Sequence, residues 1–337
     1  MTMQALVITS IANDQHPILK QFATDCLQRN IPFYLMGDTK SPADFNLEGC
    51  NFYSIDDQIK TGFSIVDQLP VKHYSRKNIG YLLAIQQGAE TIIESDDDNI
   101  PLENFWNKRE RYQTGDKITN QGWINIFNHF STEHIWPRGY PIELVQAESE
   151  NIPSIETGNY DCPIQIGLVQ KNPDVDAIYR MTCKLPVYFE DGKKVSVGNG
   201  TWSPFNSQNT VWYKDAFPLM YLPSYCSFRM TDIWRSFIAQ RIAWENDWNI
   251  CFHSPSVIHE RNEAILLNDF NLEVPGYLNN RKIAKSLEAL NLKRGQAAIA
   301  ENLLRCYELF VENKWIEDKE MELVERWNGD LKEFGAI

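Results

Sequence analysis

Short apolar runs alternate with helically spaced apolar positions along the first hundred residues. Ala5–Ile11 is apolar and β-branched, which predicts a buried strand, whereas Pro17–Arg29 carries apolar side chains at helical spacing. The same patterns predict three more strands and one more helix, over Pro32–Met36, Asn51–Ile55, Thr91–Glu94 and Ser75–Gln87. We expect Ser75 to cap that helix and Gly88 to end it. Repeated strand–helix units indicate a mostly parallel sheet, in which ligands bind beyond the C-terminal ends of the strands.

The pattern changes between about residues 121 and 225, where the helical period fades and prolines and aromatic residues are frequent. Short apolar runs there predict a mixed or antiparallel part of the sheet with ordered loops. These runs are Gly122–Phe130, Gln165–Gln170 and Val175–Met181. Helical spacing returns at Asp232–Trp244, and Ile250–Phe252 predicts another short strand.

After about residue 264 the chain is dominated by amphipathic helical patterns. Three helices are predicted, over Lys282–Leu292, Gln296–Glu312 and Glu317–Trp327. They are typical of a helical cap that packs either on the preceding domain or on a second copy of the chain. The pattern does not decide whether the chain forms a homo-oligomer through these helices. We therefore predict an α/β domain over residues 1–263 and a C-terminal helical extension over residues 264–337.

Composition and charge exclude several classes of protein. The 337 residues include 32 Lys and Arg against 45 Asp and Glu, and the net charge of −13 argues against binding to nucleic acid or to an anionic membrane surface. Seven cysteines form no CxxC pair, so a zinc knuckle and a disulfide framework are disfavoured. The N-terminus lacks a signal-peptide pattern, and no apolar run approaches the ~18 residues of a membrane span. We expect a cytoplasmic protein without a transmembrane segment, with peripheral membrane association left open.

An acidic cluster, Glu94-Ser-Asp-Asp-Asp-Asn99, directly follows the apolar start of the strand predicted at Thr91–Glu94. Consecutive carboxylates repel one another, so folding them together raises their pKa values or requires a cation. A hard divalent ion, Mg²⁺ or Mn²⁺, relieves that repulsion and can hold a diphosphate at the same time. A solvated acidic turn is the alternative, but a position at a strand end of an α/β sheet favours metal or nucleotide binding.

Two cations, Arg76 and Lys77, lie at the start of the helix predicted from Ser75, with Asn78 next to them. Cations at a helix start oppose the helix dipole, and an anionic ligand there would resolve that conflict. We therefore expect this segment to contact the phosphate or ribose of a nucleotide. The alternative is that both cations neutralise the acidic cluster or are exposed to solvent, and the two interpretations are compatible.

Several segments, taken together, resemble the STELLO family of probable glycosyltransferases, in unbroken order over roughly residues 5–262. They are Tyr74–Ala89, Asp96–Asp98, His134–Pro141, Pro173–Arg180, Pro204–Thr210 and Arg229–Arg235. The resemblance implies a GT-A-like nucleotide-sugar-binding fold, which is Rossmann-like, and a more distant similarity to the reversibly glycosylated polypeptides. It also implies a nucleotide-sugar donor and a divalent metal, Mn²⁺ or Mg²⁺. It leaves the donor unidentified, and the acceptor stays open among glycan, lipid-linked and small-molecule classes.

The resemblance further implies roles for the acidic cluster. In GT-A enzymes the strand-end acidic motif binds the ribose with its first carboxylate and the metal with its last. Here those residues are Asp96 and Asp98. Asp97 is a possible second ligand and a further donor-binding residue, and Asp96 is also a candidate metal ligand. A histidine late in the fold often completes the metal shell, and we expect His259 in that role, with His253 as the second choice.

The ends of the first two strands are implied to bind the base. Thr9, Ser10 and Ile11 would line it, and Asp38 and Lys40 could lie close by.

Asp232 has two interpretations. It precedes an apolar-periodic run, which fits an ordinary helix N-cap. Alternatively it is the general base of an inverting transfer, taking the proton of an acceptor hydroxyl, or a substrate-positioning residue if configuration is retained. Arg229 and Arg235 flank it and could hold it ionised or bind an acidic acceptor.

The middle of the chain supplies candidate sugar-binding residues. Trp136, Arg138, Asn206 and Asn209 combine flat apolar faces with polar donors, as carbohydrate recognition requires. An aromatic residue in a chain of this length is more often part of the core.

We therefore hypothesise a metal-dependent glycosyltransferase that moves a sugar from a nucleotide-sugar donor to an acceptor hydroxyl in glycan or polysaccharide synthesis, with inversion slightly favoured. The alternatives are a nucleotide-sugar mutase and a non-catalytic nucleotide-sugar-binding scaffold subunit.

Overall fold

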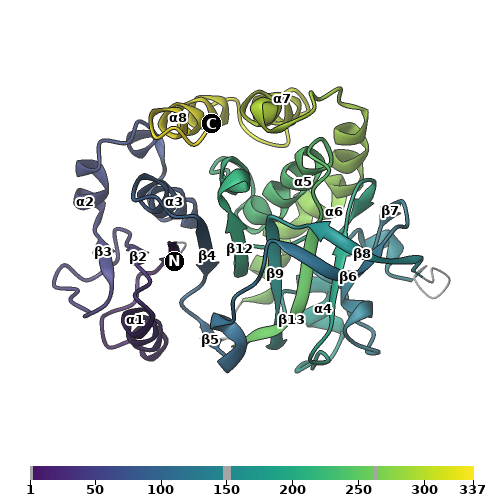
Figure 1. Cartoon of the computed structure of the whole chain (residues 1–337), viewed down its shortest axis with the longest axis horizontal. Helices are drawn as coiled ribbons and strands as arrows, with labels where there is room; N and C mark the ends of the chain where they lie inside the picture. The colour runs from purple at the N-terminus through teal and green to yellow at the C-terminus, as the bar shows by residue number, and fades with distance from the viewer. Residues whose placement is uncertain (1–2, 147–152, 261–264) are drawn as a thin grey trace.

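A computed structural model describes residues 3–146, 153–260 and 265–337. A large sheet forms the centre of the molecule, with strands in the order β3-β2-β1-β4-β12-β9-β13-β10-β6-β8 and with β5 paired to β13. Helices cover both faces of the sheet, and the C-terminal helices lie across one end (Figure 1).

The N-terminal part of the sheet is entirely parallel. It consists of β1 (Gln4–Thr9), β2 (Phe33–Met36), β3 (Asn51–Tyr53) and β4 (Thr91–Ser95). Their spatial order, β3-β2-β1-β4, is the order of one half of a Rossmann-like sheet, so the fold agrees with the predicted α/β class. The intervening helices are α1 (Pro17–Arg29), α2 (Ile55–Lys60) and α3 (Lys77–Gln86).

Alternating residues of β1 divide the apolar core into two layers. Leu6 and Ile8 pack with Phe22 of α1 on one face, whereas Val7 packs with Ile79 of α3 on the other. Such alternation follows from the period of two along a strand. Because β1 is parallel to both β2 and β4, the C-terminal ends of these three strands lie at the same edge of the sheet.

The second part of the sheet is mixed, as the fading helical period predicted. Strand β12 (Asn209–Tyr213) is antiparallel to both β4 and β9 (Ile164–Lys171), and β13 (Ile250–His259) is parallel to β9. The remaining strands of this sheet are β5 (Asn99–Pro101), β6 (Tyr112–Ile118), β8 (Ile155–Asp161) and β10 (Lys194–Val197). A separate two-stranded ribbon is formed by β7 (Gly122–Trp123) and β11 (Thr201–Trp202).

The C-terminal helices pack on the α/β body. They are α6 (Leu266–Ala289), α7 (Ile299–Glu312) and α8 (Glu320–Glu333). Figure 1 shows α7 and α8 lying side by side above α5 (Thr231–Trp244) and α3. Helix α7 contacts α5, α8 contacts α3, and α7 and α8 contact each other. The predicted packing on the preceding body is therefore confirmed, whereas the boundary at residues 263/264 stays a prediction.

Several local predictions are wrong. Only Gly122–Trp123 of the run Gly122–Phe130 is a strand, since Ile126–His129 forms a 3-10 helix, and the helix predicted over Lys282–Leu292 already begins at Leu266. The run Val175–Met181 forms a helix, α4 (Ala177–Thr182), because the Asp176 carboxylate accepts a hydrogen bond from the backbone N–H of Tyr179 and caps it. Ser75 does not cap α3. The Nδ1 atom of His73 accepts from the Ser75 N–H instead, and the Ser75 hydroxyl is bonded to Ser224. Gly88 does end the helix, in the left-handed conformation with φ of +85°.

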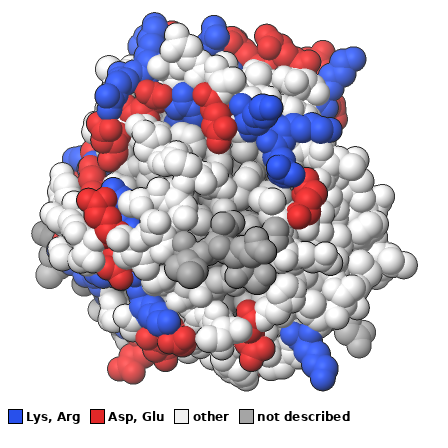
Figure 2. Space-filling view, turned by 90° about the vertical axis from the view of Figure 1, so that its right-hand side faces the viewer, with Lys and Arg blue, Asp and Glu red and all other residues white. Residues whose placement is uncertain are grey.

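On the face of the molecule shown in Figure 2, the described residues include Lys and Arg next to Asp and Glu, most densely along the upper edge. The two signs are interspersed there rather than gathered into a basic patch. Among the described residues, no helix has the length and apolar character that crossing a membrane requires. All seven cysteines are free thiols.

Candidate functional site

A cavity of about 510 Å³ opens at the edge of the sheet where β1, β2 and β4 end. Its walls bring together twelve of the residues singled out from the sequence, although they come from six separate stretches of chain. They are Thr9, Ser10, Ile11, Asp38, Lys40, Arg76, Asp96, Asp97, Asp98, Arg138, Arg229 and Asp232. We refer to this cavity as the main pocket.

Each carboxylate of the acidic loop after β4 has a different partner. Asp96 accepts a hydrogen bond from the buried ammonium of Lys77 at 2.8 Å. Asp97 accepts a short hydrogen bond from the Ser10 hydroxyl, and Asp98 lies 3.0 Å from Nε2 of His259. Three adjacent acids are thus accommodated by one cation, one hydroxyl and one imidazole.

These partners leave the three acids electrostatically distinct. Burial raises the pKa of Asp96 to about 6, against the opposing charge of Lys77 and with the help of Asp98. Burial also raises the pKa of Asp97, although the Ser10 hydrogen bond opposes it. Burial acts in the same direction on Asp98, but the hydrogen bond and charge of His259 outweigh it and hold the pKa of Asp98 below its usual value.

Strand pairing explains why these partners meet. Because β1 and β4 are parallel with Val7 opposite Glu94, the residues that follow them, Ser10 and Asp97, come level at the sheet edge. His259 reaches Asp98 because the short strand β5 runs antiparallel to β13, with Asn99 opposite His259.

His259 rather than His253 is therefore the histidine at the acidic loop. His253 lies in the first half of β13, six residues before His259, and its Nε2 atom is 2.9 Å from the Gln165 side chain.

The Asp98–His259 pair fits two neighbouring positions in the shell of a divalent ion. Two such ligands with bonds of about 2.1 Å lie about 3 Å apart in an octahedral site, and the Asp98 carboxylate oxygen lies 3.0 Å from Nε2 of His259. Within the described ranges, no three His, Cys, Asp or Glu side chains are grouped so that they could hold a metal by themselves. Further ligands would have to come from water or from substrate phosphate, which is the usual situation for Mg²⁺.

The cations at the start of α3 turn inward rather than into open solvent. Lys77 is fully buried and donates to the Asp96 carboxylate and to the Ser95 carbonyl at 2.9 Å, so it neutralises the acidic loop. Arg76 lines the main pocket, but its guanidinium donates to Gln58 Oε1 at 2.6 Å and to the Leu69 carbonyl. Asn78 lies outside the pocket, bonded in both directions to the backbone of Leu222.

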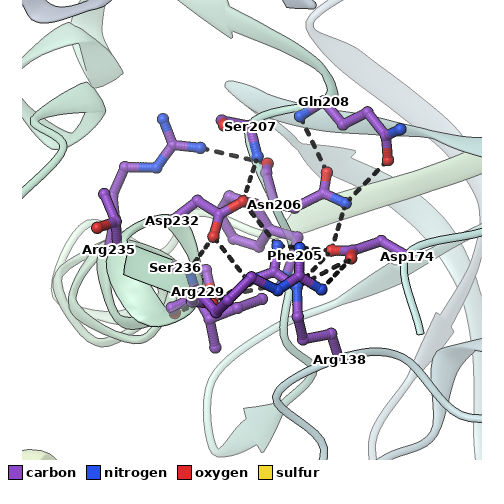
Figure 3. Close-up of polar contacts among 12 residues, drawn as sticks. Arg138, Asp174, Phe205, Asn206, Ser207, Gln208, Arg229, Asp232, Arg235 and Ser236 are labelled. Atoms are coloured by element: carbon purple, nitrogen blue, oxygen red, sulfur yellow. Dashed lines mark hydrogen bonds and ion pairs between the residues drawn. The ribbon is translucent and has the colours of Figure 1, made fainter. Parts of the chain in front are cut away.

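Arg138, which also lines the main pocket, binds two carboxylates. Its guanidinium donates to both oxygens of Asp232, at 3.0 and 2.9 Å, and to both oxygens of Asp174, at 2.9 and 2.8 Å (Figure 3). Asp232, Arg138 and Asp174 are all largely buried. Burial acts to raise the pKa of Asp174, but the charge of Arg138 holds it well below its usual value.

Asp232 is not an N-cap, because α5 begins at Thr231 and its N-cap, Met230, makes no side-chain hydrogen bond. The arginine that holds Asp232 is Arg138, not either of the flanking residues. Arg235 is fully buried and pairs with Glu94 at 2.8 Å, and Arg229 pairs with Glu273 of α6 at 2.8 Å. Each oxygen of Asp232 already accepts two hydrogen bonds, one from Arg138 and one from a backbone N–H, of Ile233 or of Ser207, which leaves no oxygen free for an acceptor hydroxyl and disfavours the general-base interpretation in this arrangement.

Three of the predicted sugar-binding residues face other parts of the protein. Trp136 is buried, and its indole N–H donates to Asp176 at 2.6 Å. Asn209 is buried against Ser256 and the Leu168 carbonyl. Asn206 donates a hydrogen bond to Asp174 at 2.8 Å and so helps to fix the carboxylate that binds Arg138 (Figure 3).

Eight residues that line the main pocket were not among the predicted site residues, and four of them carry a charge or a ring that a ligand could contact. Lys72 and the ring cluster of His73, Tyr74 and Phe228 all line the main pocket. His73 and Tyr74 are stacked with ring centroids 5.4 Å apart, and Phe228 meets Tyr74 edge-on at 4.8 Å. Burial lowers the pKa of His73 to about 4, so its imidazole is neutral at pH 7. Only their closeness to Arg76 and Arg229 in the chain could have drawn attention to them.

Comparisons with known proteins bear out the resemblance to the STELLO family. The family model described as STELLO glycosyltransferases matches residues 229–337, a segment that spans α5 and all three C-terminal helices. Two Arabidopsis thaliana proteins, named probable glycosyltransferases STELLO2 and STELLO1, are 28% and 27% identical to the chain over 315 residues. Each alignment covers 88% of this chain, and the chain spans about two fifths of the length of either relative, 41% and 40%.

Two solved structures are more distantly similar. A mycobacterial protein has a TM-score of 0.43 and 7% identity, covering 83% of this chain and 74% of its own. The mannosyltransferase PcManGT from Pyrobaculum calidifontis, solved in complex with GDP-Man and Mn²⁺, has a TM-score of 0.39 and 7% identity, covering 99% and 75%.

Proposed function

We propose that the chain is a metal-dependent glycosyltransferase of GT-A type that transfers a sugar from a nucleotide-sugar donor to an acceptor hydroxyl in glycan or polysaccharide synthesis. The observation that carries the proposal is the loop Asp96–Asp98 at the end of β4, open to a cavity of about 510 Å³ beside the ends of two parallel strands. Ligand binding at that edge is the general behaviour of such sheets. The names of the two Arabidopsis relatives support the same activity.

The donor's nucleoside is assigned to the ends of β1 and β2. Thr9, Ser10, Ile11 and Asp38 line this side of the main pocket, and Asp96 lies next to Ser10's partner, Asp97. Ile11 is about half exposed, 52%, which leaves an apolar surface on which a base can rest. Asp96 is assigned to the ribose, since its second oxygen is not used by Lys77.

The divalent ion is assigned to Asp98 and His259, whose spacing fits it. When bound, the ion would neutralise the diphosphate as that group leaves with the nucleotide.

Lys40 and Lys72 are assigned to the phosphates. Within the described part of the chain, neither makes a hydrogen bond or ion pair that would occupy its ammonium, and both line the main pocket. This assignment replaces the expected phosphate contacts of Arg76 and Lys77, because the side chains of both residues are already hydrogen-bonded within the protein.

The acceptor side is assigned to Arg138, Arg229 and Asp232, with the exposed face of Phe228 as an apolar surface for a sugar ring. Because Arg138 binds Asp232 at both oxygens, we assign Asp232 to positioning the acceptor and Arg138. Positioning can contribute strongly to rate without a proton transfer.

The proposal is tested by calorimetric titration with a panel of UDP- and GDP-sugars, with and without Mn²⁺. We expect one member of the panel to bind only with Mn²⁺, and Asp98→Ala to weaken that binding about 100-fold or more, because a ligand of the ion is lost. Glu325→Ala removes an exposed acid from α8, outside the main pocket, and should leave binding unchanged.

Binding of the same nucleotide sugar that is equally tight without metal and in Asp98→Ala would refute the mechanism. Product analysis then separates the enzyme classes. Release of nucleoside diphosphate with transfer to an added acceptor supports a transferase, whereas a changed sugar ring in donor alone identifies a mutase. Tight binding without any turnover across donors and acceptors identifies a non-catalytic binding subunit.

A further inference from the structure

A second cavity, of about 600 Å³, lies beside β6, β10 and β13 and shares no lining residue with the main pocket. Four cations line it, Lys108, Arg109, Lys193 and Lys194, against a single acid, Glu110. This balance contrasts with the chain as a whole, which carries a net charge of −13.

Two of the four cations are already paired. Lys108 lies 2.7 Å from Glu110, and Lys193 lies 2.8 Å from Glu190. The other two, Arg109 and Lys194, form no ion pair with any residue in the described ranges. The cavity therefore retains two positive charges that the described protein does not neutralise.

Arg109 is held in place by neutral groups only. Its Nη2 donates to the Ser256 hydroxyl at 2.9 Å, and its Nη1 is shielded from solvent with no hydrogen-bond partner among the described residues. Burial lowers the pKa of Arg109 to about 10, so the group is still charged at pH 7. A shielded guanidinium without a counter-ion is costly and is stabilised by an anion placed nearby.

Both unpaired cations pack on glycine. A Cβ atom at Gly167 would lie 2.7 Å from Nη2 of Arg109, and one at Gly115 would lie 3.3 Å from Cε of Lys194. A side chain at Gly167 would therefore displace the guanidinium. Lys194 is further directed by its ammonium, which donates to Gln113 Oε1 at 3.0 Å.

We propose that this second cavity binds a small phosphate-bearing anion, inorganic phosphate or the phosphate of a phosphomonoester, between Arg109 and Lys194. A compact anion carrying close to two charges matches two uncompensated cations better than a monocarboxylate does. An extended polyanion such as nucleic acid does not fit, because the surrounding surface belongs to an acidic protein. This site does not depend on the proposed transferase activity.

The test is calorimetric titration of the full chain with inorganic phosphate, in buffer with a chelator and at fixed ionic strength. We expect saturable binding of one phosphate that Lys194→Glu and Arg109→Gln each weaken by at least about tenfold. Lys194 is exposed, so Lys194→Glu should fold normally. Urea unfolding shows whether Arg109→Gln remains folded, and the Lys194 variant alone suffices if it does not.

Two control variants make the test specific. Lys285→Glu applies the same charge change at an exposed position of α6, and Lys72→Glu applies it in the main pocket. Lys285→Glu should retain wild-type phosphate affinity, and the binding that Lys194→Glu weakens should persist in Lys72→Glu. The proposal is overturned if the wild type shows no saturable binding up to about 10 mM phosphate, if Lys285→Glu weakens binding as much as Lys194→Glu does, or if binding is lost only in Lys72→Glu.

Discussion

Glu94 and the loop Asp96–Asp98 belong to the same acidic stretch, yet the protein uses them in opposite ways. Glu94 is fully buried, and Arg235 binds both of its oxygens, at 2.9 and 2.8 Å, while Tyr81 and Trp212 donate to it as well. The side chains of Asp96 and Asp98 are about two fifths exposed, 39% and 42%, and face the main pocket.

The difference lies in position along β4 rather than in residue type. Glu94 is still within the strand, where its side chain enters the core beneath α3 and α5, so every polar atom must be satisfied internally. The aspartates follow the strand, where the chain leaves the sheet and one side stays open. An acid inside the strand thus holds elements together, whereas an acid just past its end is available to a ligand.

The largest expected effect is a loss of stability when Glu94, the buried acid, is substituted. Glu94→Ala leaves the Arg235 guanidinium buried without a carboxylate, and we expect a loss of about 3–5 kcal/mol in the free energy of unfolding. Urea denaturation measures it. Asp98→Ala, at a partly exposed position, should change the same quantity by less than about 1 kcal/mol.

A double variant sharpens this result. Glu94→Leu combined with Arg235→Met removes both charges and should recover most of the lost stability, because no unpaired charge remains in the core. If Asp98→Ala destabilises the protein as much as Glu94→Ala does, the contrast between a structural and a ligand-binding acid is wrong.

The next effect concerns the pH dependence of metal binding by Asp98 and His259. Burial acts to lower the pKa of His259, but the hydrogen bond and charge of Asp98 overcome it and raise that pKa. His259 must lose its proton to bind a metal, so Mn²⁺ affinity should rise as pH increases from 6 to 8, by up to about tenfold per unit below the pKa. Calorimetry at four pH values measures this, and His259→Gln should flatten the dependence.

The same shift has the opposite effect on metal-free stability. A raised pKa in the folded state means that the Asp98–His259 pair stabilises the fold fully below the unfolded histidine value of 6.5, and that this contribution is lost as pH rises through the folded value. Metal-free protein should therefore be slightly less stable at pH 8 than at pH 6, and this difference should be smaller in His259→Gln. An affinity for Mn²⁺ that falls with rising pH would exclude His259 as a ligand.

The smallest effect is expected at the exposed rim of the pocket. Lys72→Ala removes one screened charge near the phosphates and should weaken donor binding about threefold to tenfold, with no change in stability. Lys285→Ala, an exposed lysine of α6, serves as the matched control. Equal effects of the two variants would show that Lys72 acts only through net charge.

The sequence alone was enough for those elements whose local pattern and tertiary role agree. Helix α1 begins and ends at the predicted residues Pro17 and Arg29, because its apolar stripe is also its buried face. The acidic loop was recognised as a strand-end feature for the same reason, since β4 is apolar and ends where the acids begin.

The partners of the acids could not be predicted, since they depend on pairings between distant segments. Nothing local to Lys77 indicates that its ammonium turns under Asp96 rather than toward a phosphate. His259 meets Asp98 only because β5 pairs with β13. Arg138 lies 94 positions before Asp232, so Arg229 and Arg235 seemed better placed by sequence, although both are engaged elsewhere.

A crystal structure with the bound nucleotide sugar and Mn²⁺ tests the central claim most directly, because its density locates base, phosphates and metal together. We predict the base against Thr9–Ile11, the metal in contact with Asp98 and His259, and the phosphates within reach of Lys40 and Lys72. A nucleotide sugar bound outside the main pocket, or bound in it with the metal away from Asp98, would contradict the account.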